Sequence, residues 1–220
     1  MIIQQTWNMS QTLITALNNE VRQVGEPLEG NCFYRHRSNF QLRPNTERLR
    51  ADLVRFARYG RNILEIGTNA GHSLALINEG ISKEEYNKGM IVGIDKCFHK
   101  YTKPCMDIFR EHSNKDFMFL EGTSEKVLPE LNSNGTYIRF DKIHIDGGHT
   151  ERALRNDIEM CYNLSTKETI VCIDDTNFTK IKKICDEYIS NGLLTEVSDT
   201  YFEDYKWDTK FHRLYKYVYD

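Results

Sequence analysis

Short apolar runs alternate with amphipathic segments along most of the chain. Five runs are apolar nearly throughout, as expected for strands that are buried on both faces of a sheet. They occupy residues 62–67, 90–95, 117–121, 142–146 and 169–174. Segments with helical spacing lie between and after them, at residues 72–81, 103–112, 124–131, 150–164 and 179–191. This alternation predicts an α/β fold with five parallel strands and helices on both faces of the sheet.

The two ends of the chain depart from this alternation. Near the C-terminus, residues 194–202 and 211–219 are strand-like and only a polar loop separates them, which predicts an antiparallel hairpin at one edge of the sheet. Before the first strand, residues 46–59 and 10–21 have the spacing of helices. We therefore expect an N-terminal extension over residues 1–45 and one domain over residues 46–220.

The charge of the chain limits its partners. The 29 Lys and Arg and the 32 Asp and Glu give a formal net charge of −3, which provides no overall attraction to nucleic acid or to an anionic membrane. No segment approaches the length of a membrane span. One local exception is a run of eight arginines from Arg35 to Arg61, which fits either a solvated helix face or an anion-binding or RNA-facing patch.

Cysteine usage indicates a reducing compartment. None of the six cysteines forms a C-x-x-C pair, and several lie in apolar segments, which favours buried free thiols over disulfides or a zinc site. The N-terminus also lacks a basic region followed by an apolar stretch. These features predict a cytoplasmic protein, of a cell or of a virus-infected cell.

The first apolar run leads into a glycine turn. Residues 64–71 read LEIGTNAG, in which Gly67 and Gly71 allow a sharp bend and a close approach to a ligand. The spacing matches neither the G-x-G-x-x-G of dinucleotide sites nor a phosphate-binding loop. Because Glu65 precedes the turn, the pattern favours a cationic ligand without phosphate, such as S-adenosylmethionine. The alternative is an ordinary β–α turn.

The next two strand ends add polar groups suited to a nucleoside. Ligands of parallel α/β sheets bind at the carboxyl ends of the strands. Asp95 ends the second strand, where it could accept both ribose hydroxyls, and Thr123 and Ser124 follow the third strand, where they could border an adenine ring. Their alternative role is capping the helices that follow.

The fourth and fifth strand ends carry three aspartates and a histidine. Neighbouring strands lie about 5 Å apart, so Asp146, Asp174 and Asp175 are expected to converge. Carboxylates this close repel unless a cation lies between them, and oxygen ligands suit Mg²⁺ or Mn²⁺. His149 follows two glycines and is a candidate general base. The alternative is that the aspartates cap helices and bond the glycine turn, while His149 only precedes a helix.

These motifs resemble a known family. Residues 65–73 (EIGTNAGHS), residues 144–149 (HIDGGH) and residues 173–175 (IDD) are similar to those of class I S-adenosylmethionine-dependent O-methyltransferases. The branch that they resemble contains the macrocin-type and cephalosporin-biosynthesis enzymes, many of which methylate sugar hydroxyls. The resemblance covers residues 46–220, and it implies a Rossmann-like sheet with one reversed strand.

The resemblance also implies roles for individual residues. The cofactor would contact Glu65, Gly67, Thr68, Asn69, Gly71, His72, Ser73, Asp95, Thr123, Ser124 and Asp146. Asp146, Asp174 and Asp175 would hold the divalent cation, and His149 would be the base. The N-terminal extension corresponds to a segment that is often a substrate lid in this family.

We therefore expect a metal-assisted O-methyltransferase that acts on a sugar or small-molecule hydroxyl. Aromatic residues of the tail are expected either to wall the acceptor pocket or to fill the hairpin core; they are Tyr201, Phe202, Tyr205, Trp207 and Phe211. The alternatives are an RNA- or DNA-directed methyltransferase, a metal-dependent hydrolase and a non-catalytic cofactor-binding protein. The acidic net charge argues against a nucleic-acid acceptor. No membrane partner is expected, and a homo-oligomer is left open.

Overall fold

A mixed sheet forms the centre of the protein. The computed structural model describes residues 2–81, 89–133, 138–202 and 206–219, and within them it contains seven strands in the order β3-β2-β1-β4-β5-β7-β6. The strands are β1 (Ile63–Ile66), β2 (Met90–Asp95), β3 (Asp116–Glu121), β4 (Lys142–Ile145), β5 (Ile170–Ile173), β6 (Leu194–Glu196) and β7 (Arg213–Tyr217). Strands β1 to β5 are parallel, and β7 runs antiparallel to both β5 and β6. The predicted parallel sheet with a C-terminal hairpin is confirmed.

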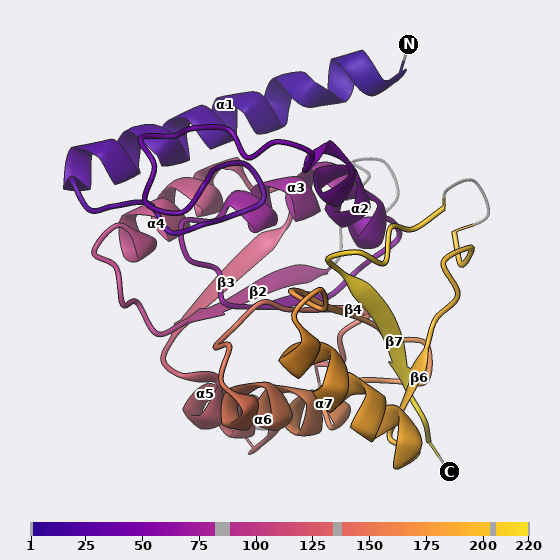
Figure 1. Ribbon diagram of the computed structural model, residues 1–220. Coiled ribbons are helices and arrows are strands. Elements are labelled where there is room, and N and C mark those ends of the chain that lie inside the picture. Colours follow the sequence, from indigo (N-terminus) through magenta and orange to yellow (C-terminus); the bar gives the residue numbers. More distant parts are fainter. Residues whose placement is uncertain (1, 82–88, 134–137, 203–205, 220) are drawn as a thin grey trace.

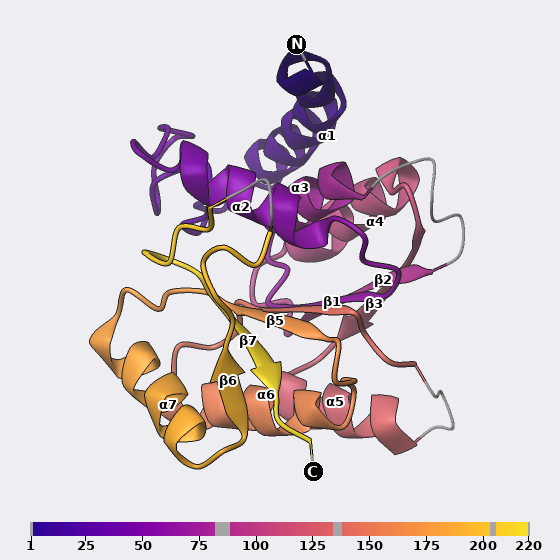
Figure 2. The ribbon, with the colours of Figure 1, turned by 90° about the vertical axis from the view of Figure 1, so that its right-hand side faces the viewer.

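Helices cover both faces of this sheet, as predicted (Figure 1). One face carries α2 (Glu47–Ala57), α3 (His72–Gly80) and α4 (Thr102–His112), and the other carries α5 (Ser124–Ser133), α6 (Glu151–Tyr162) and α7 (Thr179–Ser190). Helix α1 (Ile2–Val24) lies outside the first group and packs against α3 and α4 (Figure 2). None of the helices in the described ranges is long and apolar enough to cross a lipid bilayer.

Burial on both faces explains the uninterrupted apolar strands. In β1, Leu64 and Ile66 join the core beneath α5, α6 and α7, whereas Ile63 joins the core beneath α3 and α4. All four residues of β1, β4 and β5 are buried. The six cysteines are free and five of them are buried, which confirms the prediction of buried thiols.

The terminal segments differ from the predicted boundaries. Helix α1 begins at Ile2 rather than at residue 10, and residues 25–46 form an irregular crossing with one isolated bridge between Tyr34 and Leu42. Strand β6 ends at Glu196 rather than at residue 202. Further along, the Trp207 amide donates to the Asp199 carbonyl oxygen at 2.7 Å, and its buried indole donates to the His212 carbonyl oxygen.

Candidate active site

Strands β1 and β4 run side by side, and their carboxyl ends come into close contact because residue 67 is a glycine. Its φ is +92°, and a Cβ atom there would lie 2.0 Å from the carbonyl oxygen of Asp146. The Asp146 amide donates to the carbonyl oxygen of Ile66 at 2.9 Å. The glycine was predicted to allow close approach of a ligand, whereas here it admits the β4 backbone. It thereby fixes Asp146 beside the β1 turn.

The turn after β1 is tied to the end of β2 by Asp95. One oxygen of this half-buried carboxylate accepts from the Asn69 amide at 2.8 Å, and the other accepts from the Cys97 amide at 2.7 Å. Two buried oxygens of the turn, Thr68 Oγ1 and Asn69 Oδ1, have no hydrogen-bond partner in the described part of the chain. These atoms fit a ligand that carries amino or hydroxyl donors.

Two residues expected to contact the cofactor are buried among protein groups. Glu65 is fully buried, and its Oε1 accepts from His144 Nδ1 at 2.8 Å, because its position in β1 directs it to the sheet face beneath α2. His72 is buried between Asn18 and Asn31, with its Nε2 2.9 Å from Asn18 Oδ1. Burial lowers the pKa of His72 to about 4, so the ring is neutral.

Asp146 and Asp174 come together at the ends of β4 and β5, as predicted. Both line the same cavity, and burial together with the Asp174 charge raises the pKa of Asp146 well above its usual range. Burial also opposes ionisation of Asp174. However, His212 donates to its Oδ1 at 2.7 Å, and the charge and hydrogen bond of His212 hold the pKa of Asp174 below its usual range.

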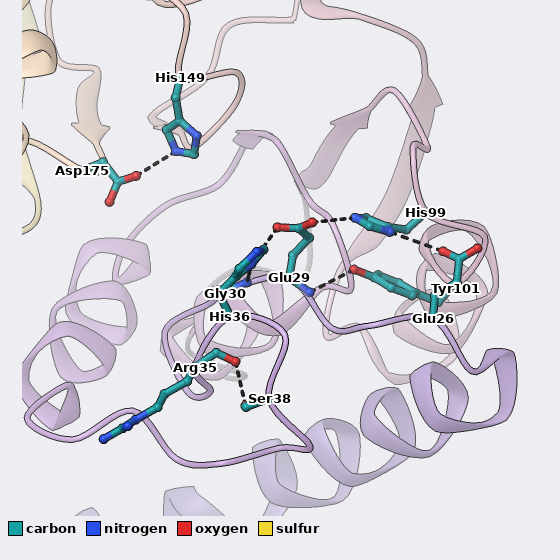
Figure 3. Close-up of polar contacts among 10 residues, drawn as sticks. All are labelled: Glu26, Glu29, Gly30, Arg35, His36, Ser38, His99, Tyr101, His149 and Asp175. Atoms are coloured by element: carbon teal, nitrogen blue, oxygen red, sulfur yellow. Dashed lines mark hydrogen bonds and ion pairs between the residues drawn. The ribbon is translucent and has the colours of Figure 1, made fainter.

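The third aspartate is directed elsewhere. Asp175, which has a φ of +57°, accepts a hydrogen bond from His149 Nε2 at 2.7 Å (Figure 3). This hydrogen bond raises the pKa of His149 above its ordinary value. The His149 side chain is 66 % exposed, so the rest of its ring is open to a ligand. The pair therefore has the form of a histidine base oriented by a carboxylate.

The three aspartates do not gather into the three-carboxylate metal site that the sequence predicted. Among the residues that the structure describes, no group of three His, Cys, Asp or Glu side chains is arranged to hold a metal ion. Asp146 and Asp174 remain as an adjacent pair, and proteins commonly bind Mg²⁺ through one or two carboxylates with water or substrate completing the shell.

A cavity of about 800 Å³ opens beside these groups. Of the predicted site residues, Ser73, Asp146, His149, Asp174 and Asp175 line it. Most of the rest of the lining comes from the N-terminal extension at Glu29–His36, from Arg43, from α7 and from the C-terminal tail. None of the other predicted site residues lines this cavity.

The aromatic residues of the tail divide between the cavity and the core. Phe211 lines the cavity, whereas Trp207 is buried with Phe56 and Leu214, and Phe202 packs against that cluster. Tyr201 is exposed and is not a lining residue, and Tyr205 falls outside the described residues. Phe178 was not predicted as a site residue; it is 54 % exposed at the start of α7 and lines the cavity.

Sequence reasoning also missed His212. It lies in the polar loop before β7, and its burial depends on Trp207, whose indole donates to the His212 carbonyl oxygen. The only available signal was a histidine near the start of the predicted strand over residues 211–219, which by itself does not indicate contact with Asp174.

Comparisons with known proteins agree with this architecture. The family described as "Methyltransferase domain" matches residues 64–176, and no curated protein sequence matches the chain. Among solved structures, an O-methyltransferase from Bacillus cereus in complex with SAH is 14 % identical, with a TM-score of 0.63, and the match covers 96 % of this chain and 90 % of that one.

Two further structures have the same fold. The O-methyltransferase TomG from Streptomyces achromogenes, in complex with SAM, is 16 % identical over 94 % of this chain and 90 % of that one, with a TM-score of 0.59. The SAH-bound methyltransferase PaMTH1 from Podospora anserina is 14 % identical over 80 % and 83 %, with a TM-score of 0.57. Since the family match spans more than half of the 220 residues, the chain belongs to the methyltransferase domain family.

Proposed function

We propose that the protein is an S-adenosylmethionine-dependent O-methyltransferase that acts on a hydroxyl of a sugar or another small molecule. The observation that carries this proposal is the His149–Asp175 pair, which faces a cavity beside the β1 turn. The family match supports methyl transfer. The O-methyltransferases of the same fold, solved with SAH or SAM, support the cofactor and the oxygen acceptor.

The cofactor would lie along the ends of β1, β2 and β3. When bound, it supplies an electrophilic methyl group on a sulfonium ion. The unpaired oxygens of Thr68 and Asn69 would accept hydrogen bonds from it, and the lone pairs left on Asp95 would accept from the ribose hydroxyls. Thr123 and Ser124 would border the adenine. Glu65 stays a predicted contact, because its Oε2, like the oxygens of Thr68 and Asn69, has no hydrogen-bond partner in the described part of the chain. His72 is less suited, since Asn18 and Asn31 lie against its ring nitrogens.

His149 would remove the proton of the acceptor hydroxyl. Its Nε2 hydrogen is held by Asp175, which leaves Nδ1 as the basic atom of the ring. Asp175 would fix the orientation of the ring and stabilise the imidazolium after proton transfer. General base catalysis of this kind contributes about 10²- to 10⁴-fold to a rate.

Asp146 and Asp174 would hold a divalent cation, Mg²⁺ or Mn²⁺. The position of the two aspartates at the ends of neighbouring strands, in the lining of one cavity, supports this assignment. When bound, the cation supplies Lewis-acid polarisation of an acceptor oxygen. Asp175 is assigned to His149 rather than to the metal.

Transfer of a labelled methyl group tests the proposal. Protein, labelled S-adenosylmethionine and a set of sugar and phenolic hydroxyl acceptors are incubated with Mg²⁺ or with EDTA. We expect base-stable label in an acceptor, loss of most activity with EDTA, and a fall of about 10²-fold or more in His149→Ala. The control is His112→Ala, which removes an exposed histidine at the end of α4 that does not line the cavity.

Each part can fail separately. Full activity in EDTA would refute the metal role, and normal turnover of His149→Ala would refute the base assignment. Label found only in RNA or DNA would refute the small-molecule acceptor.

A further inference from the structure

The sheet side of the cavity contains acids, two of which are already partnered. Asp174 is bound to His212 and Asp175 to His149, each at 2.7 Å. Asp146 lies at the end of the neighbouring strand to Asp174 and lines the same cavity. These groups account for proton removal and for a cation, and they place the chemistry on this side of the cavity.

The opposite side contains one acid, and it is engaged twice. Glu29 Oε2 lies 3.0 Å from His36 Nδ1, and Glu29 Oε1 lies 3.0 Å from His99 Nε2 (Figure 3). The side chain of Arg35 extends from the same loop away from Glu29. Glu29 therefore does not neutralise the arginine that lines the cavity with it.

Three cations line the cavity. They are Arg35, Arg43 and Lys180, and within the described part of the chain none of them forms an ion pair with an acid. The Arg43 guanidinium lies over the Phe211 ring, 5.3 Å from its centre, and this contact helps to hold the guanidinium in place.

The arginines between Arg35 and Arg61 have different environments in the structure. Arg50 is buried and donates to the Cys32 carbonyl oxygen and to Thr46 Oγ1, so it serves the loop itself. Arg35 and Arg43 are the members of the run that line the cavity. Guanidinium groups bind carboxylates and phosphates with paired hydrogen bonds, so these two arginines offer a local binding point for an anion.

We propose that the acceptor is anionic: it carries a carboxylate or a phosphate that binds Arg43, Lys180 and Arg35, while its hydroxyl is directed to His149. This inference rests on the proposed function, because it takes the cavity as the acceptor site. Phe178 and Phe211 line the same cavity and offer apolar surface to a ring of the acceptor. A small sugar acid or sugar phosphate fits this combination of groups.

A small anion fits better than a nucleic acid. The net charge of the chain is −3, and the acids of the sheet side face the same cavity. A long polyanion would be attracted by a basic surface stripe, whereas these cations line a cavity of about 800 Å³.

Calorimetric titration of the SAH-loaded protein tests the inference. The probes are glucose, glucuronate and glucose 6-phosphate, with a single-stranded RNA 12-mer as a fourth. The variants are Arg43→Gln and Lys180→Gln. The matched controls are Arg37→Gln, from the same loop, and Lys183→Gln, from the same helix; neither control residue lines the cavity. Loading with SAH is measured first for every variant, as a check of folding.

We expect at least one anionic probe to bind about tenfold or more tightly than glucose, and each cavity variant to weaken that binding about tenfold while the controls leave it unchanged. The difference between glucuronate and glucose 6-phosphate identifies the anion. Equal binding of glucose, no binding of either anion up to about 10 mM, unchanged affinity in both cavity variants, or preference for RNA would overturn the inference. Failure to load SAH refutes the proposed function instead, so the two failures are distinguishable.

Discussion

Replacing Gly67 by alanine gives a sharp test of how the site is built. The added Cβ would lie 2.0 Å from the Asp146 carbonyl oxygen, whereas real Cβ atoms essentially never come closer than 3.0 Å to such an atom. The φ of +92° adds the cost of a left-handed backbone, roughly 1–2 kcal/mol. Moving the β4 backbone to relieve the contact adds roughly 1–3 kcal/mol.

Gly192 provides a matched control. Its φ is +76°, and a Cβ there would have no atom within 4 Å, so Gly192→Ala has the backbone cost without the contact. Thermal unfolding of both variants isolates the contact term. In a domain of this size, 1 kcal/mol shifts Tm by about 2–4 °C, so Gly67→Ala is expected to melt at least roughly 2 °C below Gly192→Ala. Equal melting temperatures would refute the close contact between residue 67 and the Asp146 carbonyl oxygen.

Three further predictions concern single side chains. Burial raises the pKa of Asp157 from 3.8 to about 6, so its contribution to stability is present below pH 3.8 and is lost as the pH rises through 6. Asp157→Asn should therefore raise the unfolding free energy at pH 8 by up to roughly 3 kcal/mol and change it little near pH 4, and urea titrations that show the same gain at both pH values would contradict this. Alkylation of the native protein at pH 8 should modify only Cys97, and should do so slowly, because burial and then Asp95 raise the pKa of that thiol to about 11. Mass spectra that show rapid modification of several cysteines would contradict the buried positions of the others. Asp175→Asn should lower turnover but less than His149→Ala does, because it removes the group that orients the base and leaves the base itself; unchanged turnover would remove the orienting role.

The fold could be predicted from the sequence because its signals are local and repeated. Each parallel strand is buried on both faces and therefore appears as a short apolar run, such as residues 170–173, and each crossover helix shows its own period. The end of β6 was not predictable in this way, because the strand-like pattern continues to residue 202 whereas the strand itself ends at Glu196.

The candidate site was predicted only where position along a strand determines it. Asp146 and Asp174 end adjacent parallel strands, so their proximity follows from topology. Glu65 stays a predicted cofactor contact, and the pattern did not indicate that its Oε1 would also accept from His144. The partners of His149 and Asp174 depend on tertiary contacts that no sequence spacing encodes. The same holds for the arginines and the lysine that line the cavity.

Calorimetric titration with S-adenosylhomocysteine tests the central claim most directly. The account predicts saturable one-to-one binding with a micromolar Kd, weakened at least tenfold in Asp95→Ala, which removes the carboxylate at the end of β2. Absence of binding at millimolar S-adenosylhomocysteine by folded wild-type protein would contradict the account.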